Sequence, residues 1–135
     1  MIEHGKIIGI IGTRKRDTSA AARVIINKFE EIYEEGDWIC SGGCNKGGDR
    51  FAEQIAKSRG IPILIFYPNY KRYGSPGALF VRNGVVAETC DVVIACVMNP
   101  EDGIDKVLGR TKGGTEDTLR KFVKTQSGKS LVHLV

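Results

Sequence analysis

The stretch Lys6-Ile7-Ile8-Gly9-Ile10-Ile11-Gly12-Thr13-Arg14 decides the fold. Its central part is apolar without a break and rich in β-branched isoleucine, which is typical of a parallel strand buried on both faces. A polar turn that contains Thr13 and Arg14 follows at once. We therefore predict a buried strand over residues 6–12 whose carboxyl end leads into a polar turn.

The same alternation of short apolar runs and helical patterns continues to the end of the chain. Ala21, Ile25 and Phe29, for example, recur at helical spacing. The predicted strands cover residues 6–12, 37–41, 61–67, 91–97 and 130–135, and the predicted helices cover residues 21–33, 49–59, 78–88 and 115–125. Such alternation favours right-handed crossovers and a parallel sheet with helices on both faces. We predict a single Rossmann-like three-layer α/β/α domain over residues 1–135, with five parallel strands in the order 3-2-1-4-5.

Two connections in this scheme are long. Residues 67–77 form a predicted loop, and residues 98–112 form a polar stretch that we expect to be a mobile loop or lid. The first loop carries Tyr67, Tyr70 and Tyr73, which either stack on a base or pack the loop itself.

The composition is that of one globular domain. The 135 residues are 41% hydrophobic and 27% charged. No apolar run approaches the ~20 residues of a membrane span, and the first residues carry no signal-peptide pattern. We therefore expect a cytoplasmic protein and no membrane partner. The cysteines Cys40, Cys44, Cys90 and Cys96 follow no zinc or CxxC spacing, so we expect reduced, buried thiols and no metal site.

The net charge of +4 and the pI of about 8.9 fit an anionic small ligand. The longest basic run is Arg14-Lys15-Arg16, which is too short to indicate nucleic acid. No cofactor is evident, although Mg²⁺ held through ligand phosphates would leave no trace in the sequence.

Glycine-rich turns follow three of the predicted strands. These turns are Gly12-Thr13-Arg14, residues 41–49 and Gly113-Gly114-Thr115, and each leads into a predicted helix. Ligands of such sheets bind at the carboxyl ends of the strands, where free backbone N–H groups and helix dipoles favour phosphate. The spacing matches neither GxGxxG nor the Walker loop.

Short motifs also occur along the whole chain in the order found in one known superfamily. They are Gly12-Thr13-Arg14, Ser41-Gly42-Gly43, Gly47-Gly48-Asp49 with Ala52-Glu53, Tyr73-Gly74, Arg82-Asn83, Asp91-Val92-Val93-Ile94-Ala95 and Gly113-Gly114-Thr115. The chain resembles the SLOG superfamily, which groups DprA/Smf proteins with the Lonely Guy enzymes, and is most similar to the small stand-alone YspA-type branch. The resemblance implies a Rossmann-like nucleotide binder. Lonely Guy enzymes hydrolyse the N-glycosidic bond of nucleoside 5′-monophosphates, other members are proposed to sense nucleotide-derived signals, and DprA binds single-stranded DNA. Lonely Guy proteins are commonly dimers, so the resemblance also implies a homodimer or higher homo-oligomer.

The resemblance implies roles for single residues. The turn Gly113-Gly114-Thr115 resembles the phosphate-binding Gly-Thr of the Lonely Guy motif PGGxGTxEE, although Lys112 replaces the proline and one glycine is missing. Arg82, followed by Asn83, falls where those enzymes keep a catalytic arginine followed by lysine.

The carboxylates of that motif match less well. If Gly114-Thr115 corresponds to the GT, the first catalytic Glu of the family falls on Asp117, the second falls on Thr118, and Glu116 lies one position early. Cleavage of an N-glycosidic bond needs a carboxylate near its oxocarbenium-like transition state. The catalytic candidates are therefore Arg82, Asp117 and Glu116.

Each candidate also has a structural interpretation. Glu116 and Asp117 complement the helix dipole in a first turn, where acidic residues are common. Arg82 caps a helix or pairs with a surface acid, and Asp49 caps the helix that starts beside it. The predicted ligand-binding residues are Gly12, Thr13, Arg14, Ser41, Gly42, Gly43, Gly47, Asp49, Arg82, Asn83, Gly113, Gly114 and Thr115.

Three functions follow from these observations. The leading hypothesis is binding of a phosphorylated nucleotide or ribose derivative, as a sensor, carrier or sequestering module without turnover. The alternative is a nucleoside 5′-monophosphate N-glycosidase of the Lonely Guy type. Binding of single-stranded nucleic acid, as in DprA, is a weaker alternative because the net charge is modest. The sequence leaves open whether the protein is an enzyme.

Overall fold

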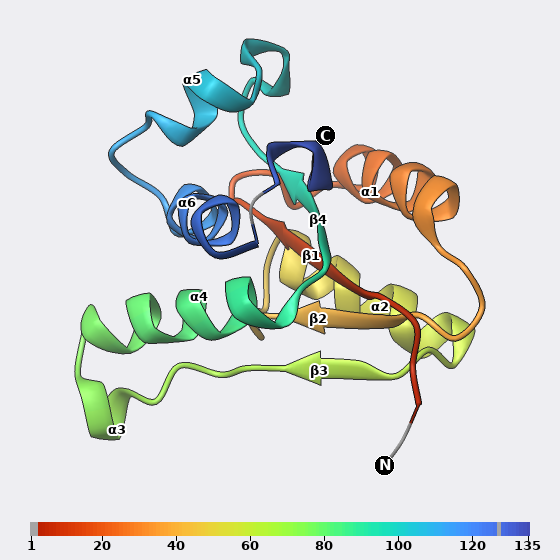
Figure 1. The fold of residues 1–135 in the computed structure, drawn as a ribbon, viewed down its shortest axis with the longest axis horizontal. Helices are drawn as coiled ribbons and strands as arrows, with labels where there is room; N and C mark the ends of the chain where they lie inside the picture. The colour runs from red at the N-terminus through yellow and green to blue at the C-terminus, as the bar shows by residue number, and fades with distance from the viewer. Residues whose placement is uncertain (1–2, 127) are drawn as a thin grey trace.

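The computed structural model describes residues 3–126 and 128–135, which form a central sheet covered by helices on both faces (Figure 1). The strands are β1 (Ile7–Gly12), β2 (Trp38–Ser41), β3 (Ile63–Ile65), β4 (Val92–Cys96) and β5 (Val132–Leu134). The α-helices are α1 (Ser19–Ile32), α2 (Gly48–Arg59), α3 (Tyr70–Tyr73), α4 (Gly77–Thr89), α5 (Ile104–Leu108) and α6 (Gly114–Gln126), and two 3₁₀ turns are η1 (Pro100–Asp102) and η2 (Lys129–Leu131).

The sheet has the predicted order and direction. Its strands run β3-β2-β1-β4-β5, and every neighbouring pair is parallel. Ile8 of β1 is in register with Ile39 of β2 on one side and with Val92 of β4 on the other. The strand order therefore reverses between β1 and β4, which confirms the predicted Rossmann-like class.

Alternate side chains of β1 divide the core into two halves. Ile8 and Ile10 pack with α1 and α2 on one face of the sheet. Ile7 and Ile11 pack with α4, α5 and α6 on the other face. Because both faces of β1 are buried, its sequence is continuously apolar and does not alternate.

The long connection after β4 was predicted as a mobile loop or lid, but it is not a continuous loop. It contains η1 and α5, and Val107 of α5 is fully buried in the core. Arg120 of α6 also donates hydrogen bonds to the carbonyl oxygens of Leu108 and Arg110. Val107, the partly buried Leu108 and these backbone contacts pack the segment against the core, although its composition is mostly polar.

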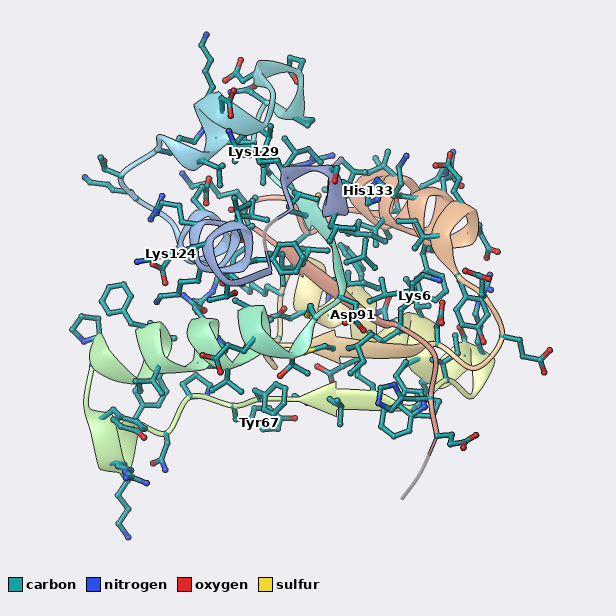
Figure 2. The ribbon with its side chains drawn as sticks, in the orientation of Figure 1. Lys6, Tyr67, Asp91, Lys124, Lys129 and His133 are labelled. Carbon is teal, nitrogen blue, oxygen red and sulfur yellow. The ribbon has the colours of Figure 1, made fainter. Side chains whose placement is uncertain are left out.

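The connection after β3 was also only partly predicted, because it includes the short helix α3. Asn69 caps this helix by accepting a hydrogen bond from Arg72 N at 3.1 Å. Tyr67 lies beyond the end of β3 (Figure 2) and is 65% exposed, and Tyr70 and Tyr73 are exposed as well. The three tyrosines therefore do not form a buried packing cluster.

The predicted strand bounds were too wide at two places. Residues 61–67 contain the three-residue β3, and residues 130–135 contain part of η2 and the three-residue β5. Both strands lie at the edges of the sheet, where pairing on one side only shortens the ladder. No helix in the described part of the chain is long and apolar enough to cross a membrane.

Candidate functional site

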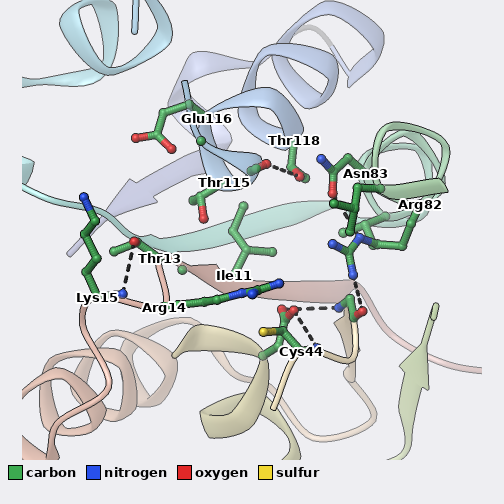
Figure 3. A pocket seen from close by; sticks show the side chains of 17 residues that line it. Ile11, Thr13, Arg14, Lys15, Cys44, Arg82, Asn83, Thr115, Glu116 and Thr118 are labelled. Atoms are coloured by element: carbon green, nitrogen blue, oxygen red, sulfur yellow. Dashed lines mark hydrogen bonds between the residues drawn. The ribbon is translucent and has the colours of Figure 1, made fainter. Parts of the chain in front are cut away.

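A cavity of about 380 Å³ lies at the carboxyl end of β1, next to the point where the strand order reverses (Figure 3). It is lined by residues from all three predicted glycine-rich turns and from α4. This meeting is a consequence of topology, because the carboxyl ends of parallel strands share one edge of the sheet.

Most of the predicted ligand-binding residues line this cavity. They are Gly12, Thr13, Arg14, Gly42, Asp49, Arg82, Asn83, Gly113, Gly114 and Thr115. Of the catalytic candidates, Arg82 and Glu116 line it. Among the described residues that line it, we find neither Asp117 nor Ser41, Gly43 and Gly47.

The first turn is anchored on β4 and presents two cations. Thr13 N donates to Cys96 O at 2.9 Å, and Thr13 Oγ1 accepts from Lys15 N at 3.3 Å. Arg14 and Lys15 are exposed and line the cavity. Neither side chain has an ion-pair partner within the residues that the structure describes. Their charges are therefore free to meet an anion.

The start of α2 is already occupied by a carboxylate of the protein itself. Asp17 Oδ1 accepts from Gly47 N at 2.7 Å and from Arg50 Nε at 2.9 Å. The Gly47 N–H bond and the Arg50 guanidinium lower the pKa of Asp17 below its usual value. Gly47 therefore uses its N–H group within the protein, although the sequence suggested it as a ligand donor.

Gly48 allows α2 to pack directly against the end of β1. A Cβ atom at this position would lie 2.3 Å from Ile11 C and 2.4 Å from Gly12 N. Both neighbours are backbone atoms, which cannot move independently of the strand. The glycine is required here by a close approach of two backbones.

Asp49 holds the turn after β2 and does not cap its own helix, so that prediction was wrong. It lies inside α2, whose N-cap residue is Gly47. Its carboxylate accepts from Gly42 N at 3.3 Å and from Cys44 N at 3.0 Å. Burial raises the pKa of Asp49, and the two N–H bonds and the charge of Arg82 oppose that rise in part. The turn geometry depends on this buried carboxylate.

The same turn uses Gly43 internally. Gly43 N donates to Ser41 Oγ at 3.2 Å. The N–H groups of residues 42, 43 and 44 are therefore all engaged by side chains of the protein. This arrangement leaves the turn after β2 as a wall of the cavity with few free donors.

The start of α6 contrasts with the start of α2, because its first turn opens into the cavity. Gly113, with a φ of 112°, precedes the helix, and Gly114 and Thr115 form its first residues. The first N–H groups of a helix have no partner within the helix, and the positive end of the dipole lies there. This turn is therefore a candidate anion-binding element of the cavity.

Glu116 brings a negative charge to this helix start. Glu116 is 9% exposed, and Arg110 Nη1 lies 3.5 Å from Glu116 Oε2. A Cβ atom at Gly113 would lie 2.4 Å from Glu116 Oε1, so the carboxylate folds back over the helix start. Glu116 is thus an acid at the cavity and also an internal partner of the helix dipole.

Asp117 faces a different direction. Its Oδ2 accepts from Asn83 Nδ2 at 2.9 Å and from Lys121 Nζ at 2.7 Å. Arg82 in turn donates to the carbonyl oxygen of Gly42 through Nη1 and to Asn83 Oδ1 through Nε at 3.0 Å. The four side chains join α4 and α6 at one wall of the cavity.

Sequence analysis missed several lining residues. They are Ile11, Lys15, Cys44, Leu79, Val86 and Thr118. Lys15 and Cys44 stand inside turns that the sequence had already marked. Thr118 lies one turn after Thr115 on α6, so helical periodicity alone would have placed both on the same face.

The cysteines are free thiols. Cys40, Cys90 and Cys96 are buried as predicted, whereas Cys44 is partly exposed at the cavity. The neighbouring Cys40 thiol and burial raise the pKa of Cys90 well above its usual value. In the described part of the chain, no three His, Cys, Asp or Glu side chains gather as a metal site would require.

The fold and the cavity place the protein among Rossmann-like α/β domains with a candidate anion site at the switch point of the sheet. Comparison of the chain with protein-family models, with curated proteins and with solved structures gave no match.

Proposed function

We propose that the protein binds a phosphorylated nucleotide or ribose derivative in this cavity, as a sensor, carrier or sequestering module. The observation that carries the proposal is the start of α6, which opens into the cavity together with Arg14 and Lys15, two cations without an ion-pair partner among the described residues. Free helix N–H groups combined with guanidinium and ammonium groups are the usual partners of phosphate. The resemblance to the SLOG superfamily adds the nucleotide class.

The two helix starts suggest how the ligand lies. The start of α2 already binds the Asp17 carboxylate, which disfavours a second anion there. At α6 the Glu116 carboxylate lies over Gly113, but within the described residues its hydrogen-bond partner is Arg110 and not an N–H group of the helix. The phosphate is therefore proposed to bind at Gly114 and Thr115, with the ribose or base toward Arg82 and Asn83. The cavity volume lies within the range of about 300–1,000 Å³ that is usual for small-molecule sites.

A second candidate function is N-glycosidic hydrolysis, and one observation favours it. Glu116 lines the cavity and is the acid nearest to the proposed phosphate position. Hydrolysis would use its carboxylate to stabilise the oxocarbenium-like state or to activate water. Asp117, which the resemblance makes the counterpart of the family's catalytic Glu, is already bonded to Asn83 and Lys121.

The test is incubation of the purified protein with AMP, GMP, CMP, deoxynucleoside monophosphates, NAD and ADP-ribose, with and without Mg²⁺. Mass spectrometry follows the ligand retained on the protein and any free base released. Retention without conversion supports the binding module, and free base from a monophosphate supports the hydrolase. If no compound is retained or converted, the proposed function is wrong.

A further inference from the structure

A continuous chain of hydrogen bonds links α6 to the turn after β2. Lys121 Nζ and Asn83 Nδ2 both donate to Asp117 Oδ2, at 2.7 Å and 2.9 Å. Asn83 Oδ1 accepts from Arg82 Nε at 3.0 Å, and Arg82 Nη1 donates to Gly42 O. Figure 3 shows Asn83 and Arg82 side by side at the cavity wall.

The middle of this chain is shielded from water. Asn83 is only 4% exposed, and the side chain of Asp117 is 17% exposed. When a buried polar group lacks one of its hydrogen bonds, the free energy of the folded protein rises. The bonds of Asn83 are therefore expected to persist in solution.

The Asp117 carboxylate selects the orientation of the Asn83 amide. An ionised carboxylate only accepts hydrogen bonds, so the NH₂ group of Asn83 must face it. The amide oxygen then faces Arg82, whose Nε only donates. In the flipped amide, oxygen would face the carboxylate and NH₂ would face Nε–H, and both bonds would be lost.

The same chain determines which donors of Arg82 reach the cavity. One N–H at Nε and one at Nη1 are used by Asn83 and Gly42. In the described part of the chain, Nη2 makes no hydrogen bond, and Arg82 lines the cavity. A guanidinium held at two points presents its remaining N–H groups in a fixed direction.

We propose that Asp117 is a positioning residue that acts through the Asn83 amide to hold the Arg82 guanidinium at the cavity wall. Lys121 supports this role by pairing with the same carboxylate oxygen. That the held guanidinium contacts a ligand rests on the proposed function; the positioning itself does not.

Asp117→Asn separates positioning from catalysis. Its amide oxygen can still accept from both Asn83 and Lys121, so the orientation of Asn83 is kept. If the Asp117 carboxylate were catalytic, an amide in its place could not do its chemistry, and activity would be lost. Asp117→Ala removes the acceptor and frees the Asn83 amide to rotate.

The first experiment observes Arg82 in the free protein. The Nε–Hε resonance of Arg82, assigned by its loss in Arg82→Lys, is measured by ¹⁵N NMR for its rate of hydrogen exchange. We expect Asp117→Ala to speed exchange by about tenfold or more, as the loss of a buried hydrogen bond does. Asp117→Asn is expected to leave the rate near that of the unaltered protein.

The matched control is Asp105→Ala. Asp105 pairs with Lys129 (labelled in Figure 2), and both side chains are exposed and absent from the described lining of the cavity. This variant is expected to leave Arg82 unchanged. An unchanged rate of hydrogen exchange at Arg82 Nε–Hε in a folded Asp117→Ala protein would overturn the proposal.

The second experiment is a double-mutant cycle read by calorimetric titration with AMP. We expect Asp117→Ala to weaken AMP binding about tenfold alone and by less than about twofold in the Arg82→Ala background. Equal losses in both backgrounds would overturn the positioning role. If the unaltered protein binds no nucleotide while the exchange of Arg82 responds as expected, the proposed function fails and the positioning role stands.

Discussion

The starts of α2 and α6 lie at the same sheet edge but are built for different tasks. At α2, Gly48 packs backbone against backbone on β1, and Asp17 fills the position of an external anion. At α6, the first turn opens into the cavity, and the Glu116 side chain is the group nearest to Gly113. A glycine-rich turn before a helix can therefore serve packing in one place and line an open cavity in another.

The largest expected effect on stability concerns the start of α2, where Gly48 packs against β1. Gly48→Ala should destabilise the protein by about 3 kcal/mol or more, because its Cβ atom meets the backbone of Ile11 and Gly12 and neither can give way. Urea unfolding followed by circular dichroism measures the change in free energy of unfolding.

Gly84→Ala on α4 is the matched control. Its Cβ atom would lie 4.0 Å from the flexible Lys121 side chain, so we expect a gain of about 0.5–1 kcal/mol from the lower entropy of the unfolded chain. A loss at Gly84 equal to that at Gly48 would mean that the packing argument is wrong.

The second effect concerns ligand affinity at the cavity beside the start of α6. The double variant Arg14→Ala/Lys15→Ala should weaken AMP binding about 100-fold, because two charge-assisted contacts to phosphate are removed. Stability should change little, since both side chains are exposed. Isothermal titration calorimetry measures the affinity.

Lys124→Ala provides the control for net charge. Lys124 (labelled in Figure 2) is exposed on the last turn of α6, whereas residues of the first turn line the cavity. A comparable loss of affinity in this variant would show that binding depends on net charge and not on the site.

The sequence predicted the sheet because each strand carries its own signal. The continuous apolar run of β1 and the repeated helical periodicity identified the strands and helices, and the Rossmann-like class that they imply supplied the strand order found. The helix α5 was missed because its only apolar contacts with the core in the described structure come from a short stretch that includes Val107 and Leu108, within a mostly polar segment. The Asn83–Asp117 contact was missed because 34 residues separate its partners, and only the packing of α4 on α6 brings them together.

The third effect tests the internal anion of α2 through pH. The pKa of Asp17 is lowered in the folded protein, so its charge stabilises the fold above the unfolded pKa of about 3.8 and loses that effect as pH falls through the lower folded value. Asp17→Asn should therefore lower the urea midpoint at pH 7 and approach the unaltered protein as the pH falls below about 3.8. AMP affinity should stay the same; a loss like that of Arg14→Ala/Lys15→Ala would indicate that phosphate binds at α2.

The smallest expected effect is that of Glu116→Gln at the start of α6, and it distinguishes a binding module from a hydrolase. Glu116 lies at the proposed phosphate position and repels a second anion, so Glu116→Gln should tighten AMP binding about threefold in a binding module, as expected for one screened charge pair. Gln keeps the size of the side chain and a hydrogen-bond acceptor for Arg110, which limits the change to charge.

In a hydrolase the same variant would abolish the release of free base from AMP, because the carboxylate near the oxocarbenium-like state is gone. Tighter binding together with no base release from either protein would assign the open start of α6 to ligand retention alone.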